Sequence, residues 1–137
     1  MGLILDSSVL IDAERRRDNV EKLIERIVSV AGDQDAALSA MGVTEIAHAI
    51  YRAQTLEIRL RRQAFIDDIL RAFAVYPYTT TTALLAARID GEQQAQGVKI
   101  PLPDLLVGVT ALELGFSVLT INVRHFRLIP GLDVIQH

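Results

Sequence analysis

The sequence predicts an α/β fold in a single domain, residues 1–137, built on a parallel β-sheet covered by helices. Three observations predict this class. The length of 137 residues suits one domain with one substantial core. Short apolar segments recur without strict alternation, as expected of strands that are buried on both faces. Amphipathic stretches long enough to be helices separate these segments, and parallel strands need such crossover connections.

The expected strands are brief. The first is the aliphatic "LIL" at the start of the chain, and the second is "AALSAM". A weaker candidate, "AVYPY", contains Pro77, which suits an edge strand or a strand end because proline has no backbone N–H to donate. In chain order, we expect strands over residues 3–5, 36–41, 74–78, 117–121 and, as a short fifth strand, 132–136.

Helices are expected between these strands. In "NVEKLIERIVSVA" the apolar residues recur at three- and four-residue intervals, which places them on one face of a helix. The apolar stretch 103–114 stops at Gly115, and glycine readily adopts the left-handed conformation that ends helices. Further helices are expected over residues 44–52, 56–73 and 81–96.

Composition narrows the function classes. Half of the residues are apolar, none is cysteine and the net charge is −3. We therefore expect no disulfides and a reducing compartment, and with no secretory signal evident we expect the cytoplasm. The most apolar tract, residues 105–121, contains Glu113 and Gly115 and suits a helix, a turn and a strand better than a membrane span. Because the chain is slightly acidic, any binding of nucleic acid must depend on local basic clusters.

Three acidic residues lie where strands are expected to pass into helices. Asp6 directly follows the first strand, Glu45 follows the second, and Asp104 lies in the first turn of the helix after "PLP". Each acid alone is explained by helix capping or by the helix dipole, which favours acids at helix N-termini. Together they have a second interpretation, because the carboxyl ends of parallel strands meet at one edge of the sheet, where α/β folds bind ligands.

Carboxylates gathered in one crevice raise one another's pKa unless a cation lies among them. Oxygen ligands without cysteine favour the hard cations Mg²⁺ and Mn²⁺. The sequence therefore predicts a divalent-metal site at Asp6, Glu45 and Asp104. Ser7 or Ser8 would support this site by hydrogen bonding to Asp6 or to a metal-bound water, or would instead only cap the helix.

Four segments resemble the PIN-domain family, and in particular its VapC-like toxins. They are "ILDSSVLI", "SAMGVTEIA", "PLPDLLVGVTALELGFSVLT" and "TINVRHF", which occur in the family's order and extend nearly from end to end. The resemblance implies a three-layer α/β/α sandwich with a central parallel sheet. It also implies a metal-dependent endoribonuclease, the toxin of a toxin–antitoxin pair, with Asp6, Glu45 and Asp104 as its catalytic metal-site acids.

The last of these segments departs from the family pattern. Many relatives take a fourth acid from this loop, whereas this chain has Asn122, and it has His125 where VapC-like proteins often have aspartate. Asn122 is the candidate catalytic residue here, since its carbonyl oxygen can bind a metal ion or a water, the alternative being a turn cap. His125 is a candidate to contact a phosphate or to orient a water, the alternative being a surface or packing role.

The same resemblance implies three partners: an RNA substrate, a cognate antitoxin protein and a second copy of the toxin in a homodimer. Candidate RNA-binding residues are Ser7, His125 and the arginines of "ERRR", chiefly Arg15 and Arg16, because arginine contacts phosphate with two donors. A second cluster, "RLRR", has acids around it and suits a solvated helix face. The alternative function, given the missing fourth acid, is a non-catalytic PIN-like module that binds RNA or a partner protein.

Overall fold

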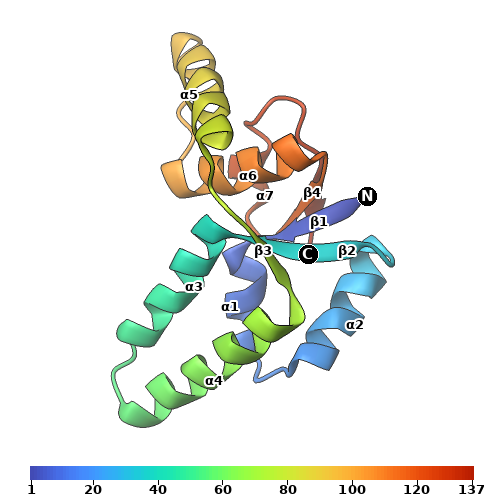
Figure 1. The fold of residues 1–137 in the computed structure, drawn as a ribbon, viewed down its shortest axis with the longest axis vertical. Coiled ribbons are helices and arrows are strands. Elements are labelled where there is room, and N and C mark those ends of the chain that lie inside the picture. Colours follow the sequence, from blue (N-terminus) through green and yellow to red (C-terminus); the bar gives the residue numbers. More distant parts are fainter.

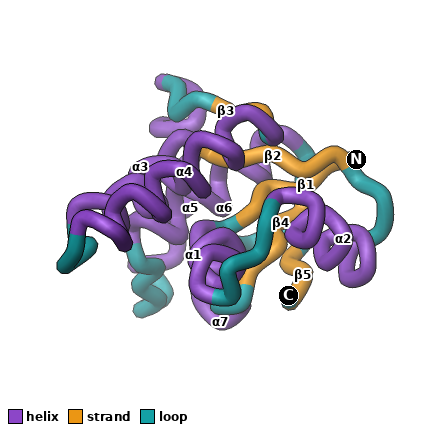
Figure 2. Tube along the Cα trace, turned by 90° about the horizontal axis from the view of Figure 1, so that it is seen from below, coloured by secondary structure: helices purple, strands orange, loops and turns teal.

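The computed structural model describes all 137 residues and confirms the predicted α/β fold. Five parallel strands form one sheet in the order β3-β2-β1-β4-β5, which can be followed across Figure 2. Strand β1, at the centre, therefore brings Asp6 to the middle of the sheet edge. The strands are β1 (Gly2–Leu5), β2 (Asp35–Ser39), β3 (Ala74–Tyr76), β4 (Ser117–Thr120) and β5 (Val134–Gln136).

Seven helices cover the two faces of the sheet and give the three layers. Helices α1 to α4 lie on one face and α5 to α7 on the other (Figure 1). None of the seven is both long and apolar enough to cross a membrane. The helices are α1 (Ser7–Arg15), α2 (Val20–Ala31), α3 (Ala40–Tyr51), α4 (Leu56–Ala72), α5 (Thr80–Ala95), α6 (Leu102–Leu114) and α7 (Val123–Phe126).

The central strand supplies both halves of the core. Leu3 and Leu5 are fully buried among the helices of the first face, whereas Ile4 is fully buried among those of the second. This division follows from the strand itself, since successive side chains point to opposite faces of a sheet. Burial on both faces therefore explains why β1 is apolar at every position, but it does not explain the charged Asp6 directly after it.

Several expected boundaries are confirmed within one or two residues. Strand β3 lies at an edge of the sheet and ends before Pro77, and α6 is followed by Gly115 in the left-handed conformation, with φ of 71°. The boundary after the second strand was predicted wrongly. Strand β2 stops at Ser39, whose side chain accepts a hydrogen bond of 3.0 Å from the backbone nitrogen of Gly42, so α3 begins four residues earlier than expected.

Helix α6 packs unusually close to the segment that follows α7. A Cβ atom added at Gly108 would lie 2.3 Å from Cδ1 of Ile129, so no larger side chain fits there without a shift. The aromatic ring of Phe126, which is fully buried, lies against the same part of α6. This packing fixes the position of α7 relative to α6, and these two helices carry His125 and Asp104.

Candidate metal centre

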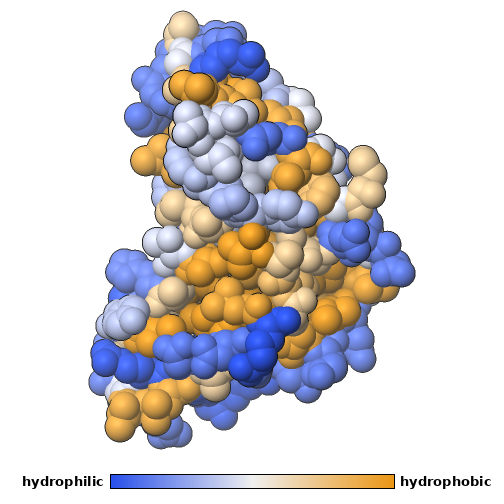
Figure 3. Space-filling model, viewed as in Figure 1, coloured by the Kyte–Doolittle hydropathy of each residue, from blue (hydrophilic) through white to orange (hydrophobic).

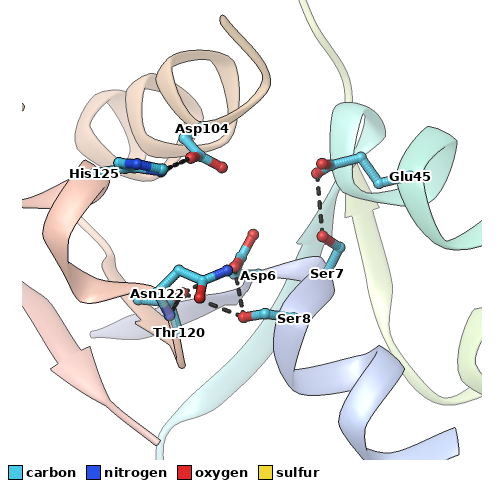
Figure 4. A network of polar contacts seen from close by, with 8 residues as sticks. All are labelled: Asp6, Ser7, Ser8, Glu45, Asp104, Thr120, Asn122 and His125. Carbon is cyan, nitrogen blue, oxygen red and sulfur yellow. Dashed lines mark hydrogen bonds and ion pairs between the residues drawn. The ribbon is translucent and has the colours of Figure 1, made fainter. Parts of the chain in front are cut away.

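The three predicted acids meet at the carboxyl edge of the sheet. Asp6 follows β1, Glu45 lies in α3 and Asp104 lies in the first turn of α6. Figure 4 shows their carboxyl groups facing one common space, with an oxygen of each acid directed into it. The structure therefore brings together side chains that are up to 98 positions apart in the sequence, counted from Asp6 to Asp104 (104 − 6).

Asp6 is nearly inaccessible, with 2% of its surface exposed. Its side chain makes no capping hydrogen bond to α1, so the capping interpretation is wrong for this residue. Instead, the hydroxyls of Ser8 and Thr120 donate to Oδ2 over 2.7 and 2.8 Å. Each hydroxyl in turn accepts a backbone N–H, that of Ile121 at Ser8 and that of Asn122 at Thr120. Oδ2 is thus fully engaged, while Oδ1 takes no hydrogen bond from the protein.

Glu45 is held by the neighbouring serine. The Ser7 hydroxyl donates to Oε1 of Glu45 over 3.2 Å. The two serines thus have different partners, since Ser8 holds Asp6. Because α3 starts at Ala40, Glu45 belongs to its second turn, and an interaction with the helix N-terminus no longer accounts for the acid.

Asp104 is held from the other side of the space. Nδ1 of His125 lies 2.7 Å from Oδ2 of Asp104, and the side chains are 38% and 19% exposed. Asp104 is not the capping residue of α6, because that position is occupied by Pro101. His125 therefore does not have the purely surface role that was one alternative from the sequence.

The site carries an excess of negative charge. Burial raises the pKa of Glu45 and the nearby Asp6 carboxylate raises it further; the Ser7 hydrogen bond lowers it, and Asp104 adds a smaller rise. Burial also raises the pKa of Asp104, as does Asp6, while the hydrogen bond and charge of His125 lower it. A divalent cation among these groups would remove the repulsion.

Neutralising one of these acids is expected to stabilise the metal-free protein. Because the pKa values of Glu45 and Asp104 are raised in the folded protein, both acids bind protons more readily there than in the unfolded chain. At neutral pH their negative charges therefore destabilise the folded protein, and this effect is relieved as the pH falls through the raised pKa values. Calorimetry in EDTA at pH 7 should show Tm rising by roughly 1–3 °C for Asp104→Asn and Glu45→Gln, but not for the exposed control Glu25→Gln. A lower Tm in both site variants would contradict this electrostatic account.

The residues fit a hydrated cation better than a preformed cage. No three His, Asp or Glu side chains are gathered tightly enough to make a ready-made metal site. Mg²⁺ usually retains several waters and uses only one or two carboxylates as direct ligands, an arrangement that this spacing allows. The chemistry of the donor set, three carboxylates that each keep an oxygen free of protein hydrogen bonds, suits such hard cations.

The loop after β4 completes the site. Asn122 occupies the cap position of α7 but makes no side-chain capping bond, so the turn-cap alternative is not observed, and Figure 4 shows its side chain directed toward Asp6. Sequence reasoning missed α7, which is too short to show periodicity, and it missed Thr120. The signal for Thr120 is a polar residue at the end of an apolar strand, where it is fully buried.

The structure separates the predicted arginines from the acids. Arg15 ends α1 and Arg16 follows it, so both lie at the opposite end of the helix from Asp6, about 13 Å along its axis. Arg16 also pairs with Asp12 over 2.9 Å. Another arginine, Arg124, is exposed, has no acidic partner and lines a hollow of about 420 Å³ with Asn122 and His125.

Comparison with known proteins places these features in a family. The family model described as PIN domain matches residues 3–131 of the chain. Among curated proteins, the chain is 31% identical to Ribonuclease VapC1 of Rickettsia felis over 98% of its own length and 96% of that protein. It is 27% identical to Ribonuclease VapC of Rickettsia bellii over the same shares.

Solved structures share the fold. The crystal structure of VapBC2 from Rickettsia felis, bound to a promoter DNA fragment, has a chain with a TM-score of 0.85 and 17% identity, and the alignment covers 100% of this chain and 99% of that one. DNA-bound VapBC from Salmonella typhimurium gives a TM-score of 0.82 at 19% identity, with 99% and 98% covered. At these identities the likeness establishes the arrangement of the sheet and helices.

Proposed function

This chain belongs to the PIN-domain family, and from its site we infer that it is the ribonuclease toxin of a toxin–antitoxin pair, which hydrolyses RNA with Mg²⁺ or Mn²⁺. The observation that carries this proposal is the convergence of Asp6, Glu45 and Asp104 on one space at the sheet edge. Two relatives that match nearly the full length of the chain are named as ribonucleases, which supports RNA hydrolysis as the reaction.

In this proposal the acids hold the metal ion and the attacking water. When bound, the ion supplies a water of lowered pKa and neutralises charge on the scissile phosphate. Asp6, Glu45 and Asp104 would hold this ion, directly or through water. The free oxygen of Asp104 accepts a hydrogen bond from the attacking water and orients it, and the side-chain carbonyl of Asn122 is a further acceptor. In-line attack by water leaves a 5′-phosphate and a 3′-hydroxyl, with no covalent intermediate on the protein.

A non-catalytic module that binds RNA is the second candidate, because no fourth acid is present in the loop 121–125. The two functions separate in one experiment. Antitoxin-free protein is incubated with a panel of structured RNAs in Mg²⁺, in Mn²⁺ and in EDTA, and binding to the same RNAs is measured by fluorescence anisotropy. We expect cleavage only with metal. Binding without cleavage in any metal would establish the module instead.

We propose Arg124 as a phosphate-contacting residue. It lies between Asn122 and His125 and no acidic side chain neutralises it. In EDTA, Arg124→Ala should weaken RNA binding about 5–10-fold. It should also reduce the slope of log Kd against log[salt] by about one, which is the contribution of a single phosphate contact. The matched control is Arg88→Ala, which removes another exposed arginine, one that faces Glu92 on α5. Equal effects of the two substitutions would refute the proposal.

Arg15 and Arg16 stay in the proposal as contacts to a more distant part of the RNA. Their place at the far end of α1 means that a short oligonucleotide bound at the acids would not reach them. We therefore expect Arg15→Ala to weaken the binding of long RNA while short RNA binds as before. Ser7, which donates to Glu45, is proposed to support the site through that acid.

The partners are proposed from the same family. Structures of VapBC pairs among the relatives favour a cognate antitoxin, which would be encoded beside this gene.

A homodimer is also proposed, and Figure 3 shows apolar surface around β3 and between α3 and α4. Large apolar side chains are exposed there, with Leu56, Leu60, Leu70 and Val75 between 42% and 71% accessible. We propose that the pair acts in the cytoplasm, since a chain without cysteine suits a reducing compartment.

A further inference from the structure

The three acids of the site are held in the same manner. Ser8 and Thr120 hold Asp6 by Oδ2, Ser7 holds Glu45 by Oε1, and each acid keeps its other oxygen free. Asp104 follows this pattern with a different donor, the Nδ1 atom of His125. The first two acids are held by hydroxyls from the start of α1 and the end of β4, whereas Asp104 depends on a residue of α7.

We infer that His125 is a positioning residue, which holds Asp104 by Oδ2 so that its Oδ1 stays directed toward Asp6 and Glu45. Figure 4 shows this second oxygen pointing into the space between the acids. His125 provides the only side-chain hydrogen bond to the Asp104 carboxyl group. Without it, Asp104 would be free to rotate toward solvent from the first turn of α6. The inference rests on the proposed metal site for its functional meaning.

The geometry determines which atom of the ring makes this contact. An ionised carboxylate only accepts hydrogen bonds, so Nδ1 carries the proton of this contact and donates it to Oδ2. The ring is placed by the residue that follows it, since Phe126 is fully buried against α6. The packing of Phe126 on α6 therefore fixes the backbone position from which His125 reaches Asp104.

Three substitutions of His125 test whether the hydrogen-bond donor to Asp104 must lie at the position of Nδ1 or whether any donor suffices. Asparagine places an amide nitrogen close to where Nδ1 lies, glutamine places one closer to where Nε2 lies, and alanine has no donor. His125→Asn should therefore retain the contact with Asp104, whereas His125→Gln and His125→Ala should lose it. All three retain the buried Phe126, so we expect the packing of α7 on α6 to be unchanged.

Two measurements on each variant test the inference. In crystal structures of the metal-free proteins, Asp104 should keep its orientation in the wild type and in His125→Asn, and should turn away from Asp6 in the other two. In calorimetric titrations with Mn²⁺ alone, affinity should fall about 10–100-fold for His125→Ala and His125→Gln, and no more than about threefold for His125→Asn.

Unchanged Asp104 orientation and unchanged Mn²⁺ affinity in His125→Ala would overturn the inference, as would an asparagine variant that behaves like the alanine variant. The proposed function fails separately, if wild-type protein binds no Mn²⁺. In that case the Asp104 orientation in the metal-free crystals still decides whether His125 positions it.

Discussion

Replacing Asp6 with asparagine is expected to lower the rate of RNA cleavage by about 10³-fold or more while the protein stays folded. Asparagine has the same shape, and its side-chain oxygen still accepts the hydrogen bonds from Ser8 and Thr120. Its amide nitrogen then replaces the free oxygen that faces Glu45 and Asp104, which removes a ligand charge from the metal site. Loss of charge stabilisation by a metal ion costs several kcal/mol in the transition state, which corresponds to a factor of this size.

Single-turnover cleavage in Mn²⁺ measures this effect, and thermal unfolding checks that the variant is folded. The matched control is Asp33→Asn, at an exposed position between α2 and β2. We expect the control to cut at the wild-type rate. A variant of Asp6 that keeps more than about a tenth of the wild-type rate would show that the cluster is not the catalytic centre.

The second large effect is expected on stability, from a substitution of Phe126 in α7. Phe126 is fully buried in the core of the second face, and its ring lies next to Gly108 on α6. Replacing it with alanine should lower the free energy of unfolding by about 3–5 kcal/mol, because a cavity is left in a close-packed region. That is a large share of the roughly 5–15 kcal/mol typical of a folded domain.

Urea unfolding of Phe126→Ala and Phe126→Leu tests this prediction. Leucine fills part of the space, so it should cost less than half as much as alanine. Because α7 carries His125, the alanine variant should also bind Mn²⁺ more weakly, even at urea concentrations below its unfolding midpoint. A cost of less than about 1 kcal/mol for alanine would mean that α7 does not depend on this packing.

Much of the fold could be predicted because its signals are local. The continuous apolar run at Leu3 to Leu5 indicates a strand buried on both sides, and Gly115 marks the end of α6. The boundary at Ser39 was missed because serine in "AALSAM" continues an apolar-looking segment, and only the hydrogen bond to Gly42 shows that it caps α3. Helix α7 was missed because four residues cannot display a helical period.

The acids of the site could be predicted from the sequence, but the contacts that orient them could not. Strand and helix junctions indicated Asp6, Glu45 and Asp104, since parallel strands deliver their carboxyl ends to one edge. The partners of these acids are distant in sequence: Thr120 lies 114 positions from Asp6 and His125 lies 21 from Asp104. Such contacts depend on which strands are neighbours and on how α7 packs, and neither can be deduced from spacing along the chain.

The most direct test of the central claim is mass spectrometry of the products that the purified, antitoxin-free protein makes from one RNA in Mn²⁺ and in EDTA. Hydrolysis by a water held among Asp6, Glu45 and Asp104 predicts fragments with 5′-phosphate and 3′-hydroxyl ends in Mn²⁺ and intact RNA in EDTA. Fragments that end in 2′,3′-cyclic phosphate and persist in EDTA would contradict it, because attack by the neighbouring 2′-hydroxyl needs no metal-bound water.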